Sequence, residues 1–239
     1  MHYIRLPLNS SLNTRDLGGY AAKDGSVTKF GVFLRSDDIS ELTEGDKSFL
    51  YDYGVRMVID LRSDDEIEQN SGAMQSDERF SFHHVPILPN NYADNMKGLL
   101  DNYFLGDLYS AVLDKGQERI CRIFKLIASQ ETGAVLFHCT LGKDRTGVIA
   151  ALLLLLVGVA QIDVIANYEV TNTYVKSIFD KVRAFAPDIP AALFESRAEY
   201  IYSMLEHLMT NYQSIESYMI KIGVTEEEIN KILCRFIVK

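Results

Sequence analysis

Two apolar stretches separated by a short polar one constrain this chain more than any other feature. The stretch "AVLFHC" (134–139) has the length and composition of a buried strand, and "VIAALLLLLVGVA" (148–160) those of a buried helix that is too short to span a bilayer. Between them "HCTLGKDRTG" (138–147) leaves room for one tight loop. The sequence therefore predicts a strand, a loop and a helix in direct succession, with the loop at the carboxyl end of the strand.

The flanking sequence extends this unit into an α/β fold. The runs "VRMVIDL" (55–61) and "FSFHHVPI" (80–87) also read as strands, and Ser63 with Glu66 fits a capping box that opens a short helix between them. Asp24-Gly25 predicts a hairpin turn within 19–36. Strands that alternate with helices through residue 160 predict a mostly parallel central sheet flanked by helices.

Beyond residue 158 the apolar spacing becomes helical, so we expect a helical C-terminus. Thr225 and Glu228 fit a capping box for its last helix. Neither 89–116 nor 175–195 has the composition of a separate domain, and either segment is a candidate lid or insertion. We therefore expect one domain over residues 1–239.

Charge and cysteine usage exclude several classes of protein. A net charge of −9 without a basic cluster argues against nucleic-acid binding. Cys121, Cys139 and Cys234 form neither a disulfide framework nor a zinc motif, which fits a reducing compartment. The start "MHYIRLPLNSS" lacks a signal peptide, so we expect a cytoplasmic protein without stable membrane insertion, or a secreted one if a leader was removed. No feature of the sequence predicts an oligomeric state.

The residues of the central loop suit the chemistry of a phosphate ester. At the start of a helix, the helix dipole and unpaired amides favour the thiolate form of Cys139. Gly142 permits a positive φ, which lets successive amides turn inward as an anion nest. Arg145 supplies a planar fork for two phosphate oxygens. The hydroxyl of Thr146 is placed to hydrogen-bond the sulfur, and Gly147 allows close helix packing.

Together these parts predict phosphoryl transfer to sulfur followed by hydrolysis, with no metal or cofactor. Thr140, Leu141 and Lys143 complete the expected substrate-binding loop, and His138 is expected to hold it by hydrogen bonds. Taken singly, Cys139 reads as a buried structural thiol and Arg145 as a cap. Their joint occurrence between a strand and a helix favours the catalytic interpretation.

The motif resembles the Cys-x5-Arg signature of cysteine-dependent protein tyrosine phosphatases. It is most similar to the atypical bacterial branch that includes mycobacterial and Listeria tyrosine/lipid phosphatases. The resemblance spans nearly the whole chain, and the further matching segments are "NTRDLGGY" (13–20), "LRSD" (34–37), "VIDLRSDDEIE" (58–68) and "SIESYMIKIGVTEEEINKI" (214–232).

The resemblance implies a phosphatase fold with a helical lid. It implies activity on phosphotyrosine proteins, often with phosphoserine/threonine or phosphoinositides. By position Cys139 is the nucleophile and Arg145 the phosphate ligand, and the branch's further active-site residues correspond to Lys143, Asp144 and Asp60. Lys143 is a candidate contact for additional phosphates on an inositol ring.

Two positions depart from the pattern of the branch. Thr14 replaces a usual aromatic residue, so that its contact with substrate is expected to be missing. Leu141 stands where a small residue is common, and we expect it to narrow the rim of the pocket.

The general acid is not fixed by the motif, because a chain without tryptophan cannot carry the Trp-Pro-Asp loop of typical tyrosine phosphatases. Asp144, Asp60 and Asp37 compete for the role. The resemblance favours Asp144 with Asp60 near it, whereas Asp37 and Asp38 read as solvated or capping residues. In the alternative interpretation, Asp144 braces the loop through a salt bridge and Asp60 is a structural partner of Arg15 or Arg62.

Three other functions remain open. An inositol polyphosphate phosphatase would use the same loop, and a pseudophosphatase would bind phosphate without turnover. A sulfur transferase of the rhodanese kind fits less well, because its loop lacks the Arg-Thr-Gly continuation into the helix.

Overall fold

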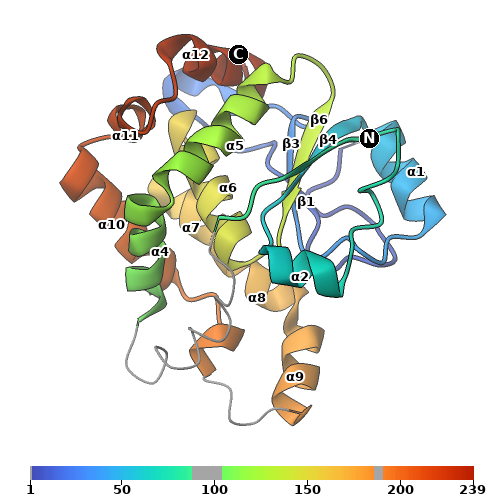
Figure 1. Cartoon of the computed structure of the whole chain (residues 1–239). Coiled ribbons are helices and arrows are strands. Elements are labelled where there is room, and N and C mark those ends of the chain that lie inside the picture. Colours follow the sequence, from blue (N-terminus) through green and yellow to red (C-terminus); the bar gives the residue numbers. More distant parts are fainter. Residues whose placement is uncertain (1, 88–103, 186–190) are drawn as a thin grey trace.

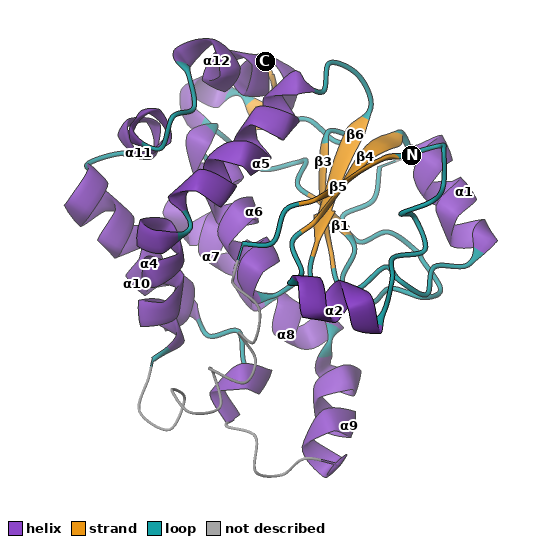
Figure 2. Cartoon of the chain, viewed as in Figure 1, coloured by secondary structure: helices purple, strands orange, loops and turns teal. Residues whose placement is uncertain are grey.

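Strand β6 (Ala134–His138) lies at the centre of a five-stranded sheet (Figures 1 and 2). The computed structural model describes residues 2–87, 104–185 and 191–239. The strand order is β1-β3-β6-β4-β5, in which only β1 is antiparallel to its neighbour. The other strands are β1 (Arg15–Asp16), β3 (Phe33–Ser36), β4 (Val55–Asp60) and β5 (Ser81–His84). The predicted α/β fold with a mostly parallel sheet is confirmed.

Successive side chains of β6 enter two different hydrophobic cores, because neighbouring residues of a strand point to opposite faces. Ala134 and Leu136 belong to the smaller core, which α1 (Glu44–Tyr53) covers. Val135, Phe137 and Cys139 belong to the larger core on the opposite face. The loop cysteine therefore points toward the side of the sheet that carries most of the helices (Figure 1).

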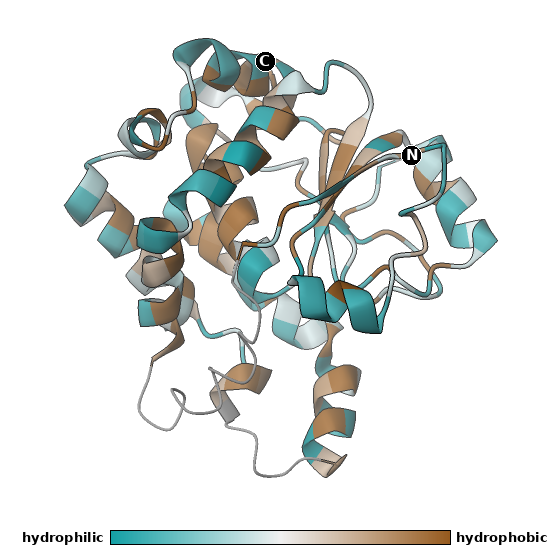
Figure 3. Ribbon diagram, in the orientation of Figure 1, coloured by the Kyte–Doolittle hydropathy of each residue, from teal (hydrophilic) through white to brown (hydrophobic). Residues whose placement is uncertain are grey.

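The larger core is built around α6 (Asp144–Leu156), which is buried along almost its whole length and hydrophobic on all sides (Figure 3). A helix of this kind is stable only inside a protein or a membrane. No helix within the described ranges is long and apolar enough to cross a bilayer. The helices that enclose the core are α4 (Leu105–Lys115), α5 (Gln117–Ser129), α7 (Gln161–Glu169), α10 (Ala198–Tyr212), α11 (Ile215–Lys221) and α12 (Glu226–Phe236).

Local signals in the sequence located several boundaries correctly. Both capping boxes form, at Ser63 for α2 (Asp64–Gln69) and at Thr225 for α12. Asp24 and Gly25 adopt the positive φ expected of the turn. The two arms of the predicted hairpin pair through a bridge between Ala21 and Val27 and through backbone hydrogen bonds from Ala22 to Ser26 and from Thr28 to Tyr20, each 2.8 Å long. Strand β2 (Val27–Thr28) also pairs with the C-terminal β7 (Ile237–Val238).

The two candidate lid segments lie only partly within the described residues, which leave out 88–103 and 186–190. The described part of the first segment includes α4, whose buried face packs in the main core. The second contains α9 (Lys176–Phe185) and a 3-10 turn (Ala191–Phe194), after the short α8 (Thr171–Tyr174). Helices α8 and α9 lie at the same end of the sheet as α2, beyond the carboxyl ends of the parallel strands (Figure 1).

Candidate active site

The segment that connects β6 to α6, residues 139–143, is here called the phosphate loop. It lies at the carboxyl edge of the parallel strands, where Asp60 ends β4 and Ser36 ends β3. Cys139, the first residue of the loop, is only 2% exposed. Open α/β sheets bind their ligands at this edge, so the loop sits where the fold favours a site.

Gly142 gives the loop its shape. Its φ is +63°, as the sequence predicted, and a Cβ at this position would lie 2.6 Å from the Ser36 carbonyl oxygen and 2.7 Å from the Asp37 nitrogen. Any side chain at position 142 would therefore collide with the backbone of Ser36 and Asp37. Among the described residues, no hydrogen bond is donated by the amides of 140–143. A tight loop with free amides at a helix start is the arrangement that binds anions.

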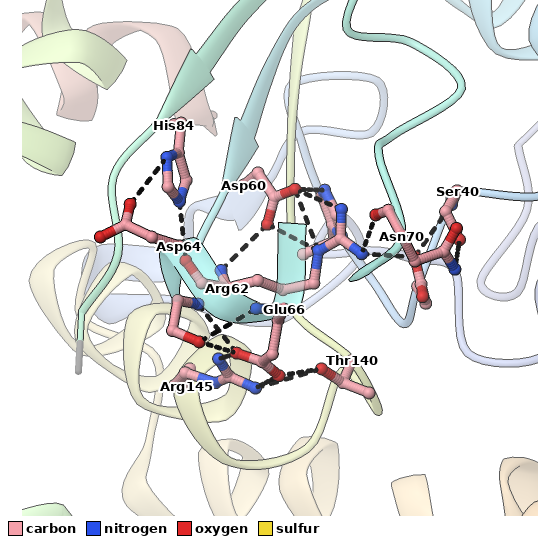
Figure 4. Close-up of polar contacts among 12 residues, drawn as sticks. Ser40, Asp60, Arg62, Asp64, Glu66, Asn70, His84, Thr140 and Arg145 are labelled. Atoms are coloured by element: carbon pink, nitrogen blue, oxygen red, sulfur yellow. Dashed lines mark hydrogen bonds and ion pairs between the residues drawn. The ribbon is translucent and has the colours of Figure 1, made fainter. Parts of the chain in front are cut away.

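The guanidinium of Arg145 is held by Glu66, the residue that also closes the capping box of α2 (Figure 4). Both carboxylate oxygens accept hydrogen bonds from the arginine, one of them at 2.8 Å, and the Thr140 hydroxyl lies 3.2 Å from the same guanidinium. Partial burial would raise the pKa of Glu66, but the hydrogen bonds and charge of Arg145 outweigh it and lower that pKa to about 2. Glu66 is thus ionised and orients the arginine, a role that its capping motif did not reveal.

Asp60 is fully buried and paired with Arg62, which donates to it at 2.7 Å, while His138 Nε2 lies 3.3 Å from its Oδ2 (Figure 4). Burial favours the neutral acid, yet the nearby His138 and Arg62 prevail and hold the pKa of Asp60 well below its usual range. Of the two partners suggested by the sequence, Arg62 is the one observed. This carboxylate lies against the residue before the thiol and is held by Arg62.

Asp144 stands at the first turn of α6 with its side chain 27% exposed. Its Oδ1 accepts a hydrogen bond from the Tyr109 hydroxyl, which lies 2.8 Å from the Tyr168 hydroxyl. Burial, together with the neighbouring Asp144 carboxylate, raises the pKa of both tyrosines well above the ordinary value. The tyrosines therefore stay protonated, and one oxygen of Asp144 is fixed while its carboxyl group still reaches solvent.

The side chain of Lys143 turns away from solvent. It is fully buried, and its Nζ donates to the carbonyl oxygens of Leu193 at 2.8 Å and Glu195 at 3.0 Å. Nζ also lies 3.5 Å from Asp144 Oδ1. The described structure therefore joins the phosphate loop to the segment that follows α9, and the polyphosphate contact of Lys143 stays a prediction.

Three further residues of the motif are Leu141, Thr146 and Gly147. Leu141 packs on Val175, Phe179 and Phe194. The hydroxyl of Thr146 is buried without a hydrogen-bond partner among the described residues, so the expected bond to the sulfur of Cys139 is not present in this structure and stays a prediction. A Cβ on Gly147 would approach Tyr168 to 3.1 Å, which explains the close contact between α6 and α7.

The segment 13–16 forms a buried scaffold beneath the loop. Asn13 donates to the carbonyl oxygens of Leu141 at 2.9 Å and Gly142 at 3.3 Å, and Arg15 donates to the side-chain oxygen of Asn13. Thr14, which stands where the branch has an aromatic residue, contacts the buried Ser36 hydroxyl at 2.6 Å. The sequence indicated this segment only by resemblance, because its contacts lie far along the chain.

Asp37 corrects an expectation. It was expected to be solvated or capping, but it is only 4% exposed. Its carboxylate accepts from the amides of Leu12 at 3.0 Å and Asn13 at 3.2 Å, so the solvated interpretation is wrong. No helix begins at these two amides, and the carboxylate braces a loop instead of capping a helix. Burial raises the pKa of Asp37. Its role is to fix the scaffold, not to face a substrate.

No group of three or more His, Cys, Asp or Glu side chains in the described ranges is arranged to hold a metal ion. A buried thiol at the end of the central strand, a loop with free amides and an oriented arginine are the parts that a cysteine-dependent phosphatase would need.

Comparison with known proteins identifies the family of the chain. A model of the family described as "Tyrosine phosphatase family" matches residues 6–238. A tyrosine-protein phosphatase of Nostoc commune is 33% identical in an alignment of 217 positions that covers 85% of this chain and 74% of that protein. The triple specificity protein phosphatase PtpB of Mycobacterium tuberculosis is 24% identical in an alignment of 271 positions that covers 94% of this chain and 96% of PtpB. The chain belongs to the tyrosine phosphatase family, and it is a phosphoric monoester hydrolase of the protein tyrosine phosphatase class.

Proposed function

We propose that the whole chain is one phosphatase domain that hydrolyses phosphotyrosine through a cysteinyl-phosphate intermediate and also accepts phosphoinositides. The observation that carries the proposal is the placement of Cys139 at the start of the phosphate loop and of Arg145 in the first turn of α6, on either side of amides that are free. A tetrahedral dianion bound there has the thiol on one side and charged or polar donors around its oxygens.

In the first step, the Cys139 thiolate forms a sulfur–phosphorus bond as the ester phosphorus–oxygen bond breaks. The amides of 140–143 and the fork of Arg145 stabilise the three non-bridging oxygens. Asp144 gives its proton to the leaving oxygen. In the second step, water attacks phosphorus, Asp144 takes a proton from that water, and the sulfur departs with the aid of the Thr146 hydroxyl. Inorganic phosphate is the product.

The choice of Asp144 rests on geometry. A general acid must reach the leaving group, and Asp144 is partly exposed at the mouth of the loop. Asp60 is buried and committed to Arg62, with a depressed pKa that keeps it ionised. The proposal therefore gives Asp144 the proton and Asp60 a structural role beside His138.

The substrate class rests on the comparisons and on Lys143. The matching mycobacterial enzyme is named for triple specificity, which supports activity on phosphoserine/threonine or phosphoinositides beside phosphotyrosine. Lys143 adds a cation within the loop, and it becomes available to a second phosphate once its bonds to Leu193 and Glu195 are released.

The test is hydrolysis of a chromogenic aryl phosphate, followed by phosphotyrosine, phosphoserine, phosphoinositide and soluble inositol polyphosphate substrates. The proposal expects turnover of the aryl phosphate and of phosphotyrosine in the presence of a chelator, and turnover of the phosphoinositide. Preference for the soluble polyphosphate over all others would support the inositol polyphosphate phosphatase instead. Phosphate binding with no turnover of any substrate would indicate the pseudophosphatase.

A further inference from the structure

Arg35 lies under the phosphate loop, although it is outside the Cys-x5-Arg motif. It pairs in register with Phe137 of β6, two residues before Cys139. Phe33 and Phe137 both belong to the larger core. Because side chains alternate along strands, Arg35 shares that face with Cys139. The guanidinium is fully buried there.

Among the described residues, the hydrogen-bond acceptors of this guanidinium are neutral. Nη1 donates to the side-chain oxygen of Asn167 at 2.6 Å, and Nη2 donates to the carbonyl oxygen of Gly142 at 2.5 Å. Nε has no hydrogen-bond partner among the described residues. Within the same residues, no carboxylate lies within ion-pair distance of Arg35 or of the neighbouring buried Arg15. A buried cation without an anionic partner costs free energy of folding. The position of Arg35 therefore indicates that a negative charge forms near it.

The ionisable side chains near Arg35 indicate which group balances its charge. Burial lowers the pKa of Arg35 to about 10, which still leaves it protonated at neutral pH. Among the titratable and charged groups that act on it are Cys139, Tyr20, Tyr168, Tyr109 and Arg15. Cys139 contributes the largest favourable interaction of these. Burial raises the pKa of Tyr109 and Tyr168 well above the ordinary tyrosine value, so neither supplies a negative charge near neutral pH, whereas the start of α6 favours the thiolate form of Cys139.

We infer that Arg35 is the buried counter-cation of the Cys139 thiolate, a positioning residue that stabilises the nucleophile from beneath while Arg145 binds the substrate. This inference rests on the proposed function, in which Cys139 is the nucleophile. The inference also accounts for the hydrogen bond from Arg35 to Gly142. The same guanidinium then supports the phosphate loop and stabilises the anionic form of Cys139. An opposite charge close to an ionisable group favours the charged form.

The experiment follows thiolate formation by its ultraviolet absorbance as a function of pH. Each protein is measured against the same protein carrying Cys139→Ser, so that other thiols and tyrosines cancel. In Arg35→Met the midpoint is expected to move upward by about one to three pH units. Arg35→Lys keeps the charge and is expected to stay near the wild-type midpoint. An unchanged midpoint in folded Arg35→Met, or equal shifts in the Met and Lys variants, overturns the inference.

A second variant keeps the test decisive if Arg35→Met does not fold. Asn167→Asp is isosteric and gives Arg35 a carboxylate at the terminal nitrogen that does not bond Gly142. It is expected to raise the midpoint without removing any side chain, and an unchanged midpoint counts against the inference. The proposed function fails separately, if Cys139→Ser hydrolyses substrate at the wild-type rate. If the serine variant is inactive but the midpoint of Arg35→Met is unshifted, only the role of Arg35 is wrong.

Discussion

Glu66 grips the Arg145 guanidinium with both of its carboxylate oxygens across 79 residues of sequence. An arginine offers five N–H donors, and this pair uses one on each terminal nitrogen, so the remaining donors can still meet a phosphate. Glu66 therefore orients the guanidinium of Arg145 and leaves some of its N–H groups free to bind substrate.

Removal of the negative charge from Glu66 tests this orientation. Glu66→Gln is expected to lower kcat/KM by about 10- to 100-fold, the range that corresponds to the loss of a charge-assisted hydrogen bond. Steady-state kinetics with an aryl phosphate measure the change. If Glu66 instead competed with substrate for the arginine, the variant would bind inorganic phosphate more tightly and kcat/KM would rise.

Asp60 is expected to govern stability in acid. Its folded-state pKa lies below that of an unfolded aspartate, about 3.9, so its contribution is fully present above that value and is lost as the pH falls. Urea unfolding of the wild type is expected to show a decline in stability below about pH 4. Asp60→Asn is expected to cost about 3–5 kcal/mol at neutral pH and to flatten that decline. An acid profile identical in both proteins contradicts the assignment.

The leaving group exposes the role of Asp144. A nitrophenolate hardly needs a proton, whereas an alkyl or inositol alkoxide does, so Asp144→Asn is expected to reduce kcat on alkyl phosphates by about 10²- to 10⁴-fold and on nitrophenyl phosphate by much less. Asp60→Asn is the control, with similar losses on both substrates. A leaving-group-dependent loss in Asp60→Asn alone would give the proton to Asp60 and leave Asp144 as a brace.

Lys143 is expected to discriminate between substrates. Lys143→Met should raise the KM for a phosphoinositide about 10- to 100-fold more than the KM for an aryl phosphate, because only the former offers a further phosphate. Lys143→Arg retains the charge and should lose less. An equal rise in both KM values would mean that the lysine serves only the contact with Leu193 and Glu195.

The features that the sequence predicted correctly are those set by neighbouring residues. The strand–loop–helix unit, the positive φ of Gly142 and the capping box of Ser63 depend on a few adjacent positions. The pairing of Glu66 with Arg145 was missed because the capping motif already accounted for the glutamate. The buried direction of Lys143 depends on carbonyl groups fifty residues away, which no local pattern encodes.

Distant contacts also decided between alternatives that the sequence left open. The sequence left Arg15 and Arg62 open as structural partners of Asp60, and the tertiary structure places Arg62 against it. The scaffold role of Asn13 and the buried position of Asp37 follow from the approach of the N-terminal segment to the loop. Periodicity identifies which faces are apolar, but it does not identify which polar groups meet across the sheet edge.

Trapping of the covalent intermediate tests the central claim most directly. A phosphorylated substrate labelled in its phosphate is mixed with excess enzyme, quenched in acid within the first turnover, and digested for mass spectrometry. The account predicts that the label is found on the peptide that contains Cys139, and that Cys139→Ser binds phosphate but neither forms the adduct nor turns over. Turnover by Cys139→Ser, or label on another residue of the wild-type enzyme, would contradict it.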